Sequence, residues 1–132
     1  MITLRTRTAK LDQNTLNKIA LITLMCCKQT FGINPKKRTD VKMKLIANND
    51  TCFGCYCPKT NTIKVYTDKN QNVELLIQTI IHEYTHYLQN LWKYYYLVNK
   101  VTGYENNPYE HEACRNEMIY YKPFFSHVKK FI

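Results

Sequence analysis

A chain of 132 residues with 45% hydrophobic and 13% aromatic side chains can bury a real core, which excludes a disordered or fibrous protein. Its net charge of +9, from 19 Lys and Arg against 10 Asp and Glu, favours encounter with anionic partners without identifying one. A chain of this length is expected to form one domain, spanning residues 1–132.

The amino-terminal segment and the longest apolar run bear on where the protein acts. Residues 1–10 lack the apolar core of a secretory signal, and residues 19–27 are too few to cross a bilayer. We therefore expect a soluble, intracellular protein, cytoplasmic or nuclear, with no membrane partner. In that setting the six cysteines are expected as reduced thiols. The sequence does not indicate an oligomeric state.

The first predicted element is a helix over residues 13–31. Apolar residues recur at helical spacing from Leu16 onward, Asp12 or Asn14 can cap the start, and Gly32 can end the helix.

A strand is expected after this helix. Val41, Met43 and Leu45 alternate with Lys42 and Lys44, which is typical of a strand with one face on the core and the other in water.

Two more strands are expected between turns. A turn at residues 48–50 precedes a strand over 51–57, and a turn at 58–61 precedes a strand over 62–67. The three strands fit a short antiparallel meander.

Two further helices complete the prediction. An apolar stripe at i, i+3, i+4 spacing runs from Val73 through Leu91 to Tyr95 and predicts one long helix. After a polar break, Pro108 suits the first turn of a last helix, which Pro123 is expected to end. The predicted class is α+β, with an amino-terminal helix, a small antiparallel or mixed sheet, and two more helices.

The motif His82-Glu83-Tyr84-Thr85-His86 lies in the long predicted helix. Because His82 and His86 are four residues apart, they lie one turn above each other, and their imidazoles can converge on one ion. Glu83 faces the same cavity without replacing a ligand, which suits a general base acting on water that zinc has made acidic. The motif predicts a site for one catalytic Zn²⁺ ion.

A third protein ligand is expected downstream, because catalytic zinc keeps three protein ligands and an open position. Residues 107–113 offer Glu110, His111 and Glu112, and both carboxylate and imidazole suit zinc. The residue types alone leave the choice between these three open.

The His-Glu-x-x-His motif followed by a helix that begins Asn107-Pro108 and continues with Glu110 and Ala113 resembles the gluzincin metallopeptidases. The resemblance covers residues 62–121. It implies a minimal zincin-like domain in which Glu110 is the third zinc ligand. It also implies that the strand before the motif helix is the edge strand of the sheet and pairs with an extended substrate.

The sequence departs from the gluzincin pattern in two ways, so Glu112 and His111 also remain candidates for the third ligand. Glu112 directly precedes Ala113 and could be the ligand instead of Glu110. His111 would match the more distantly similar SprT-like proteases, whose third ligand is a histidine.

Side chains around the metal are also expected to contribute. If Glu110 binds zinc, Glu112 or Glu117 could hydrogen-bond a zinc histidine and fix its tautomer. A phenol of Tyr104 or Tyr109 could donate to a developing oxyanion, although packing explains a tyrosine equally well in a chain with 11 of them.

The cluster Cys52, Cys55 and Cys57 is dense enough for a metal knuckle, but a closed zinc site there lacks a fourth ligand. Strand geometry is expected to put Cys55 and Cys57 on one face. All three are expected as small buried side chains rather than as metal ligands.

The sequence therefore predicts a zinc metallopeptidase that acts on a protein or peptide. A second interpretation is a nucleic-acid-associated zinc module, and a SprT-like protease acting on DNA-bound proteins would combine the two. A third is an inactive metallopeptidase-like fold, because so short a chain has little material for a deep specificity pocket. The basic surface of the second interpretation would comprise Lys36, Lys37, Arg38, Lys42 and Lys44.

Overall fold

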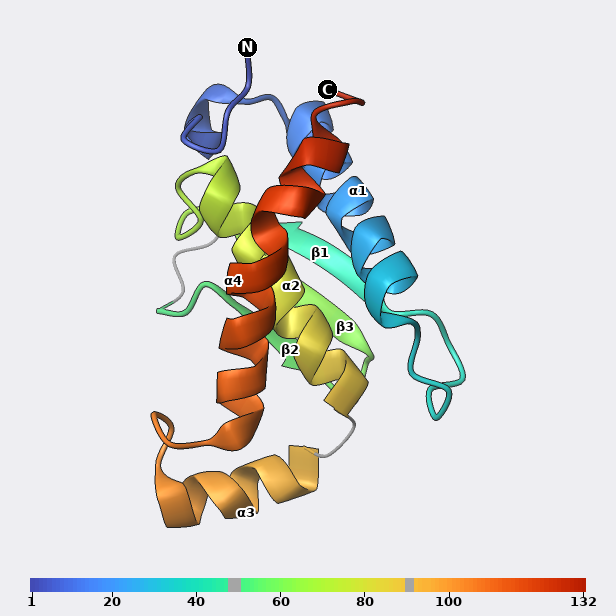
Figure 1. Cartoon of the computed structure of the whole chain (residues 1–132), viewed down its shortest axis with the longest axis vertical. Coiled ribbons are helices and arrows are strands. Elements are labelled where there is room, and N and C mark those ends of the chain that lie inside the picture. Colours follow the sequence, from blue (N-terminus) through green and yellow to red (C-terminus); the bar gives the residue numbers. More distant parts are fainter. Residues whose placement is uncertain (48–50, 90–91) are drawn as a thin grey trace.

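The computed structural model describes residues 1–47, 51–89 and 92–132, without the side chains of residues 92 and 93. Four helices and a three-stranded mixed sheet confirm the expected α+β class (Figure 1). The predicted turn at 48–50, and Leu91 of the apolar stripe, lie outside the described residues. In chain order the elements are η1 (Thr8–Lys10), α1 (Gln13–Phe31), β1 (Lys42–Ile46), β2 (Gly54–Cys57), β3 (Thr62–Tyr66), α2 (Val73–Gln89), α3 (Trp92–Thr102) and α4 (Pro108–Val128).

Helix α1 has the predicted bounds because its local signals agree with its packing. The Asp12 carboxylate accepts a hydrogen bond from the Thr15 backbone N–H at 2.7 Å and so caps the first turn. Gly32 ends the helix with φ of 81°, a conformation that favours glycine. Between these caps, Leu16, Ile19 and their neighbours at helical spacing are buried in the core.

The sheet has the order β1-β3-β2, so the predicted antiparallel meander is wrong in one pairing. The turn at residues 58–61 joins β2 and β3 as an antiparallel pair, as expected. Strand β1 instead lies parallel to β3, on its other side. Strand β3 is the most buried of the three, and Ile63 and Val65 on it are fully buried, as expected of the central strand.

The central position of β3 also corrects a second expectation. The strand before the motif helix was expected at the edge of the sheet, but β3 is hydrogen-bonded on both sides and has no free edge. Strands β1 and β2 are the edges of the sheet. Since β2 borders the motif helix, any edge available to a ligand near the motif belongs to β2.

The long helix predicted from Val73 to Tyr95 is two helices, because α2 ends at Gln89 and α3 begins at Trp92. Neither glycine nor proline marks this change, since residues 85–95 contain neither. Tyr95 does not continue the apolar stripe of α2. Its hydroxyl donates to Glu110 instead, which is a contact between distant segments that hydrophobic periodicity cannot reveal.

Helix α4 continues through Pro123, where it was expected to end. A proline inside a helix removes one N–H and costs about 3 kcal/mol. Pro123 is exposed, so water can reach the backbone there, while Phe124, Phe125 and Val128 beyond it are buried. Burial of these side chains offsets the cost of the proline.

Helices α2 and α4 pack together in front of the sheet (Figure 1), and this pairing positions the motif. The core between them and the inner face of the sheet is made of fully buried aliphatic side chains. They include Ile63, Val65, Leu76, Ile77, Ile80 and Ile81. No helix among the described residues is long and apolar enough to cross a bilayer.

Asn70 joins the sheet to the motif helix. Its buried amide donates to the carbonyls of Phe53 and Tyr66 at 2.9 and 2.8 Å, and its carbonyl accepts from the Thr79 hydroxyl at 2.6 Å. Asn70→Ala is expected to destabilise the fold by about 2–4 kcal/mol, because buried polar groups lose their partners.

Urea denaturation measures this effect. Asn17→Ala, which removes an amide from the exposed side of α1, is the matched control and should change stability by less than about 0.5 kcal/mol. Equal effects of the two substitutions would contradict the role assigned to Asn70.

Candidate metal centre

Helix α2 presents the two histidines of the motif on one side. The Nε2 atoms of His82 and His86 lie 3.3 Å apart, and both rings are largely buried. The convergence of the two imidazoles, predicted from their four-residue spacing, is therefore confirmed.

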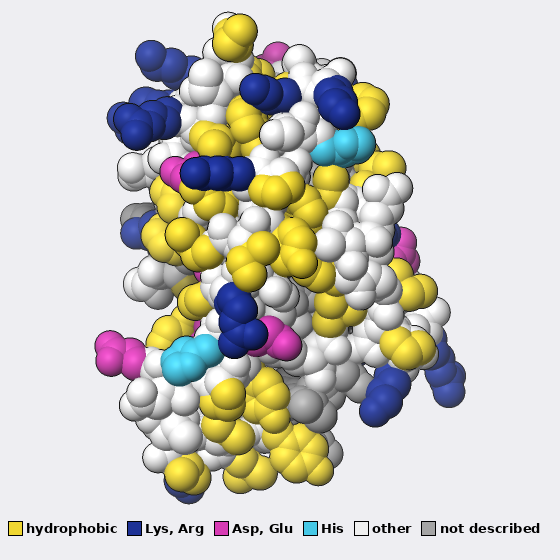
Figure 2. Space-filling model, viewed as in Figure 1, with side chains coloured by type: hydrophobic (Ala, Val, Ile, Leu, Met, Phe, Trp, Pro, Cys, Tyr) yellow, Lys and Arg dark blue, Asp and Glu magenta, His cyan; other side chains and the backbone are white. Residues whose placement is uncertain are grey.

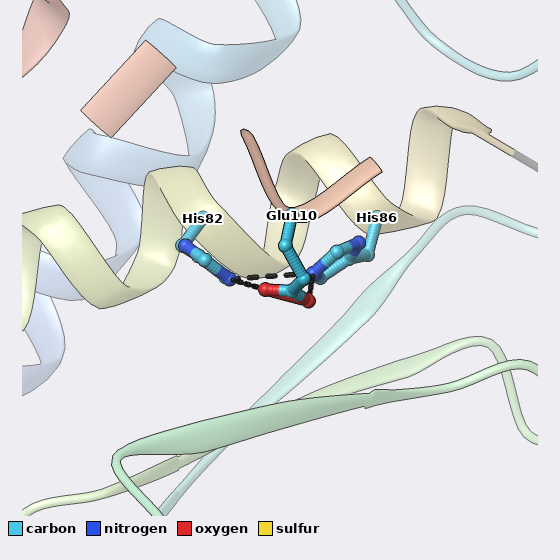
Figure 3. Close-up of side chains that lie close together, drawn as sticks. All are labelled: His82, His86 and Glu110. Carbon is cyan, nitrogen blue, oxygen red and sulfur yellow. Dashed lines mark hydrogen bonds and ion pairs between the residues drawn. The ribbon is translucent and has the colours of Figure 1, made fainter. Parts of the chain in front are cut away.

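Helix α4 brings the third side chain. The Asn107 side chain accepts from the Tyr109 N–H at 2.9 Å and caps the helix, with Pro108 in the first turn, as expected of this segment. Glu110 therefore lies in the first turn, where its carboxylate meets both imidazoles (Figure 3). Its Oε2 lies 3.0 Å from Nε2 of His82, and its Oε1 lies 2.7 Å from Nε2 of His86.

The other two candidates for the third ligand lie elsewhere. His111 is exposed and hydrogen-bonds the backbone carbonyl of Glu105. Glu112 is exposed and accepts from the side chain of Gln89 at 2.8 Å. Of the three, the structure brings Glu110 to the histidines.

The three side chains fit a metal ion by their chemistry and spacing. Zinc binds imidazole nitrogen at about 2.0–2.1 Å in tetrahedral geometry, which separates two such ligand atoms by about 3.3 Å. The separation of the two Nε2 atoms has this value, and the Glu110 oxygens lie within hydrogen-bond distance of both. His82, His86 and Glu110 could therefore hold a metal ion together.

A second layer of hydrogen bonds orients the histidines. Nδ1 of His82 lies 2.9 Å from Oε1 of Glu117, and Nδ1 of His86 lies 2.8 Å from Oε1 of Gln89. Since a carboxylate or amide oxygen only accepts, each Nδ1 carries the proton and each Nε2 faces the centre. The expected hydrogen bond between Glu117 and a histidine is confirmed.

Gln89 is a residue that the sequence did not single out. Its Nε2 donates to the Tyr109 carbonyl at 2.9 Å and to Glu112, so the side chain is held while its Oε1 faces His86. Glu112 thus acts on the histidine through Gln89 rather than directly. Gln89 lies three residues after His86, so its position on the same side of the helix was a usable signal.

The histidines and Glu110 stabilise each other's charged forms. Burial alone would lower the pKa of His82, but hydrogen bonds with Glu110 and Glu117 outweigh burial and raise the pKa to about 10. Burial likewise opposes the charge on His86, but its hydrogen bond with Glu110 and the negative charge of Glu83 raise the pKa of His86. Burial opposes ionisation of Glu110, yet hydrogen bonds with the two histidines hold its pKa well below the usual range. Without a metal, protons on the histidines therefore supply the positive charge.

Glu83 differs from the other acidic residues of the centre. It is 8% exposed, and no described side chain forms a hydrogen bond with its carboxylate. Burial raises its pKa, which two neighbouring histidines only partly oppose. A carboxylate with a raised pKa and no bound partner can take up a proton from a molecule placed beside it.

A cavity of about 300 Å³ opens onto the centre. Strand β2 forms one wall, and Gly54 allows it to approach α2 closely. A Cβ atom at Gly54 would lie 2.8 Å from Cγ2 of Thr79 and 3.5 Å from Cγ of Glu83. Aromatic side chains also form part of the cavity wall, namely Tyr95, Tyr96, Tyr104 and Tyr109.

Two tyrosines of this wall interact with Glu110. The Tyr95 hydroxyl donates to Oε1 of Glu110 at 3.1 Å, and the Tyr95 ring packs edge-on against His86. Burial and the Glu110 carboxylate raise the pKa of Tyr104, so its phenol stays protonated as a donor. Tyr104 and Tyr109 were expected near the site and do line the cavity, whereas the sequence assigned Tyr95 to the apolar stripe alone.

The cysteine cluster makes no metal site among the described residues. Cys55 and Cys57 share one face of β2, with their sulfur atoms 3.8 Å apart, as the strand pattern predicted. The expectation of three buried side chains is wrong, because Cys52 is exposed and the other two are half-buried at an edge strand. No disulfide joins any of the six cysteines, all of which lie in the described part of the chain.

The geometry predicts which substitutions weaken metal binding. Glu117→Ala should lower the affinity for Zn²⁺ about 10- to 100-fold, as loss of a group behind a metal histidine does, and Glu110→Ala should lower it further. His111→Ala should leave the affinity unchanged, because His111 faces away from the centre. Zn²⁺ titration against a chelating indicator measures all three. Loss of binding in His111→Ala with retention in Glu110→Ala would contradict the assignment.

Metal binding should also depend on pH over an unusually wide range. Protonated histidine does not bind metal, and His82 keeps its proton up to a pKa of about 10. Affinity for Zn²⁺ should therefore keep rising as the pH is raised from 6.5 to 8.5, by about tenfold per pH unit for each proton displaced. Chelator competition at several pH values measures the slope. A plateau above pH 7 would contradict the raised pKa.

Comparisons of the chain with known protein families, with curated proteins and with solved structures find no match.

Proposed function

We propose that the protein is a zinc-dependent peptidase. One observation carries the proposal: two histidines and Glu110 converge, while the buried carboxylate of Glu83 lies beside them without a hydrogen-bond partner among the described residues. A site that only stored a metal would not need a buried, unbonded base next to it. Such a base suits chemistry in which a proton is taken from water.

The donor set favours zinc as the ion. Two imidazoles and one carboxylate are a known zinc combination in hydrolytic enzymes, and three protein ligands leave a position open for water or substrate. Bound zinc would polarise a carbonyl group and make water acidic near neutral pH.

The residues around the metal have separate roles in this proposal. Glu83 takes a proton from the attacking water and passes it to the leaving amine. The phenol of Tyr104, which is held protonated, donates a hydrogen bond to the oxyanion that forms on the scissile carbonyl. Glu117 and Gln89 keep the histidines in the tautomer that leaves each Nε2 free for the metal.

Strand β2 supports a peptide or protein as the substrate. It pairs with β3 along one side, and its residues Gly54, Cys55 and Tyr56 line the cavity at the metal centre. An extended peptide can add to such an edge through main-chain hydrogen bonds. The scissile bond would then lie across the metal centre.

Glu83→Gln tests the proposed base. The substitution should lower kcat by about 10²- to 10⁴-fold and leave Zn²⁺ binding intact, because Glu83 is not among the three metal-binding side chains. Glu74→Gln, in the first turn of the same helix, is the matched control and should keep full activity. Cleavage of a fluorescence-quenched peptide library by the zinc-loaded protein measures the rate. If the zinc-loaded wild type cleaves no peptide, or Glu83→Gln cleaves equally well, the proposal fails.

A further inference from the structure

The outer face of the sheet, turned away from α2, carries three lysines in adjacent positions. Lys42 and Lys44 lie on β1, and Lys64 lies on β3. Lys44 and Lys64 are register partners, so their side chains stand side by side on the same face. The residues between them in sequence, such as Met43 and Ile63, face the core. We call Lys42, Lys44 and Lys64 the lysine face.

No negative charge on the sheet balances the lysine face. None of the three strands contains an acidic residue, and none of the three lysines forms an ion pair with a described residue. Lys42 and Lys44 are exposed, and Lys64 is half-buried. Like charges directly opposite each other on neighbouring strands destabilise a sheet. The pairing of Lys44 with Lys64 therefore costs stability that an anionic ligand would restore.

The net positive charge of the chain lies in the part of the sequence that contains the sheet. Residues 1–69 hold 13 of the 19 basic residues and four of the 10 acidic ones, so they account for the entire net charge of +9. Residues 70–132, which include the metal centre, are neutral overall. On the helical side shown in Figure 2, basic side chains are scattered among apolar and polar ones. The segment that contains the sheet is thus the positive part of the molecule.

We propose that the lysine face binds the phosphate backbone of a nucleic acid strand. Lysines two apart on a strand project at about 6.6 Å intervals, and a second lysine beside them makes a row that a linear chain of phosphates can follow. An anionic membrane fits less well. Interfacial binding also uses inserted apolar groups, and no large exposed hydrophobic side chain lies on β1, β2 or β3.

The lysine face overlaps the basic surface considered from the sequence only in part. Of the residues first considered, Lys42 and Lys44 belong to the lysine face, and Lys64 joins them through the register of β1 and β3. Lys37 does not, because its ammonium lies 5.9 Å from the centre of the Tyr56 ring, on the side of the sheet that faces α2. Nucleic acid on the outer face would leave the metal centre open.

The inference predicts a charge-dependent but position-specific loss of binding. The triple variant Lys42→Gln, Lys44→Gln, Lys64→Gln should bind a fluorescein-labelled 20-nucleotide oligothymidylate more weakly than the wild type. A plot of log affinity against log salt concentration should have a slope smaller in magnitude by about 2 for this variant. Each phosphate contact to a single strand contributes about 0.7 to that slope, and the variant loses three contacts. Fluorescence anisotropy between 50 and 200 mM salt gives both quantities.

A second triple variant, Lys10→Gln, Lys18→Gln, Lys130→Gln, removes the same charge from exposed sites outside the sheet. It should keep the wild-type salt slope. Thermal unfolding separates binding from folding, because the lysine-face variant should be at least as stable as the wild type once Lys44 and Lys64 no longer repel.

Three outcomes would overturn the inference. One is equal loss of binding in both triple variants, which would show an effect of net charge alone. Another is no binding of the oligonucleotide by the wild type. The third is binding to phosphatidylserine vesicles without binding to the oligonucleotide. Binding should be the same for metal-free and zinc-loaded protein, so it is measured independently of the proposed peptidase activity.

Discussion

The candidate centre depends on one contact, in which the carboxylate of Glu110 lies between the imidazoles of His82 and His86. The histidines come from the middle of α2 and the carboxylate from the first turn of α4, so the contact exists only when these helices pack together. The Asn107 cap fixes where α4 begins and therefore which residue faces α2. If α4 began one residue later, His111 would take the place of Glu110 and face the two histidines of α2. Neighbouring positions on a helix point about 100° apart, so the two residues cannot both face α2.

Burying this cluster requires positive charge at its middle. Glu83, Glu110 and Glu117 surround two histidines in a space that is largely out of water, where uncompensated carboxylates are costly. The raised pKa of His82 and the lowered pKa of Glu110 show how the metal-free protein meets this need, by keeping protons on the histidines. A divalent cation supplies the same charge at one point, and it leaves Glu83 as the acidic residue without a hydrogen-bonded partner among the described side chains. The electrostatics that hold the helices together thus also prepare the site for a metal.

Local sequence signals predicted the parts of the site that depend on local geometry. Four-residue spacing on a helix put His82 and His86 together, and a proline-led helix start put Glu110 in a first turn. The choice among Glu110, His111 and Glu112 needed the packing of α4 on α2, which no local pattern contains. The α+β class and the bounds of α1 followed from periodicity and caps. The order of the strands did not, because the lengths of turns fix the β2–β3 hairpin but not the side of β3 on which β1 pairs.

The errors of sequence-based prediction concentrate around the cavity for a physical reason. Hydrophobic periodicity assumes that each apolar side chain faces the core, yet Tyr95 uses its hydroxyl on Glu110 and its ring on His86, and the helix predicted to be continuous is divided before it. The resemblance to zincins implied that β3 is the edge strand, whereas β2 reaches the site because Gly54 lets its backbone lie close to the Thr79 and Glu83 side chains of α2. In the first case the Tyr95 side chain contributes to the cavity rather than to the core. In the second, the absence of a side chain at Gly54 does so. Sequences satisfy local rules most consistently where only folding is at stake, so such departures are themselves a guide to the functional part of the molecule.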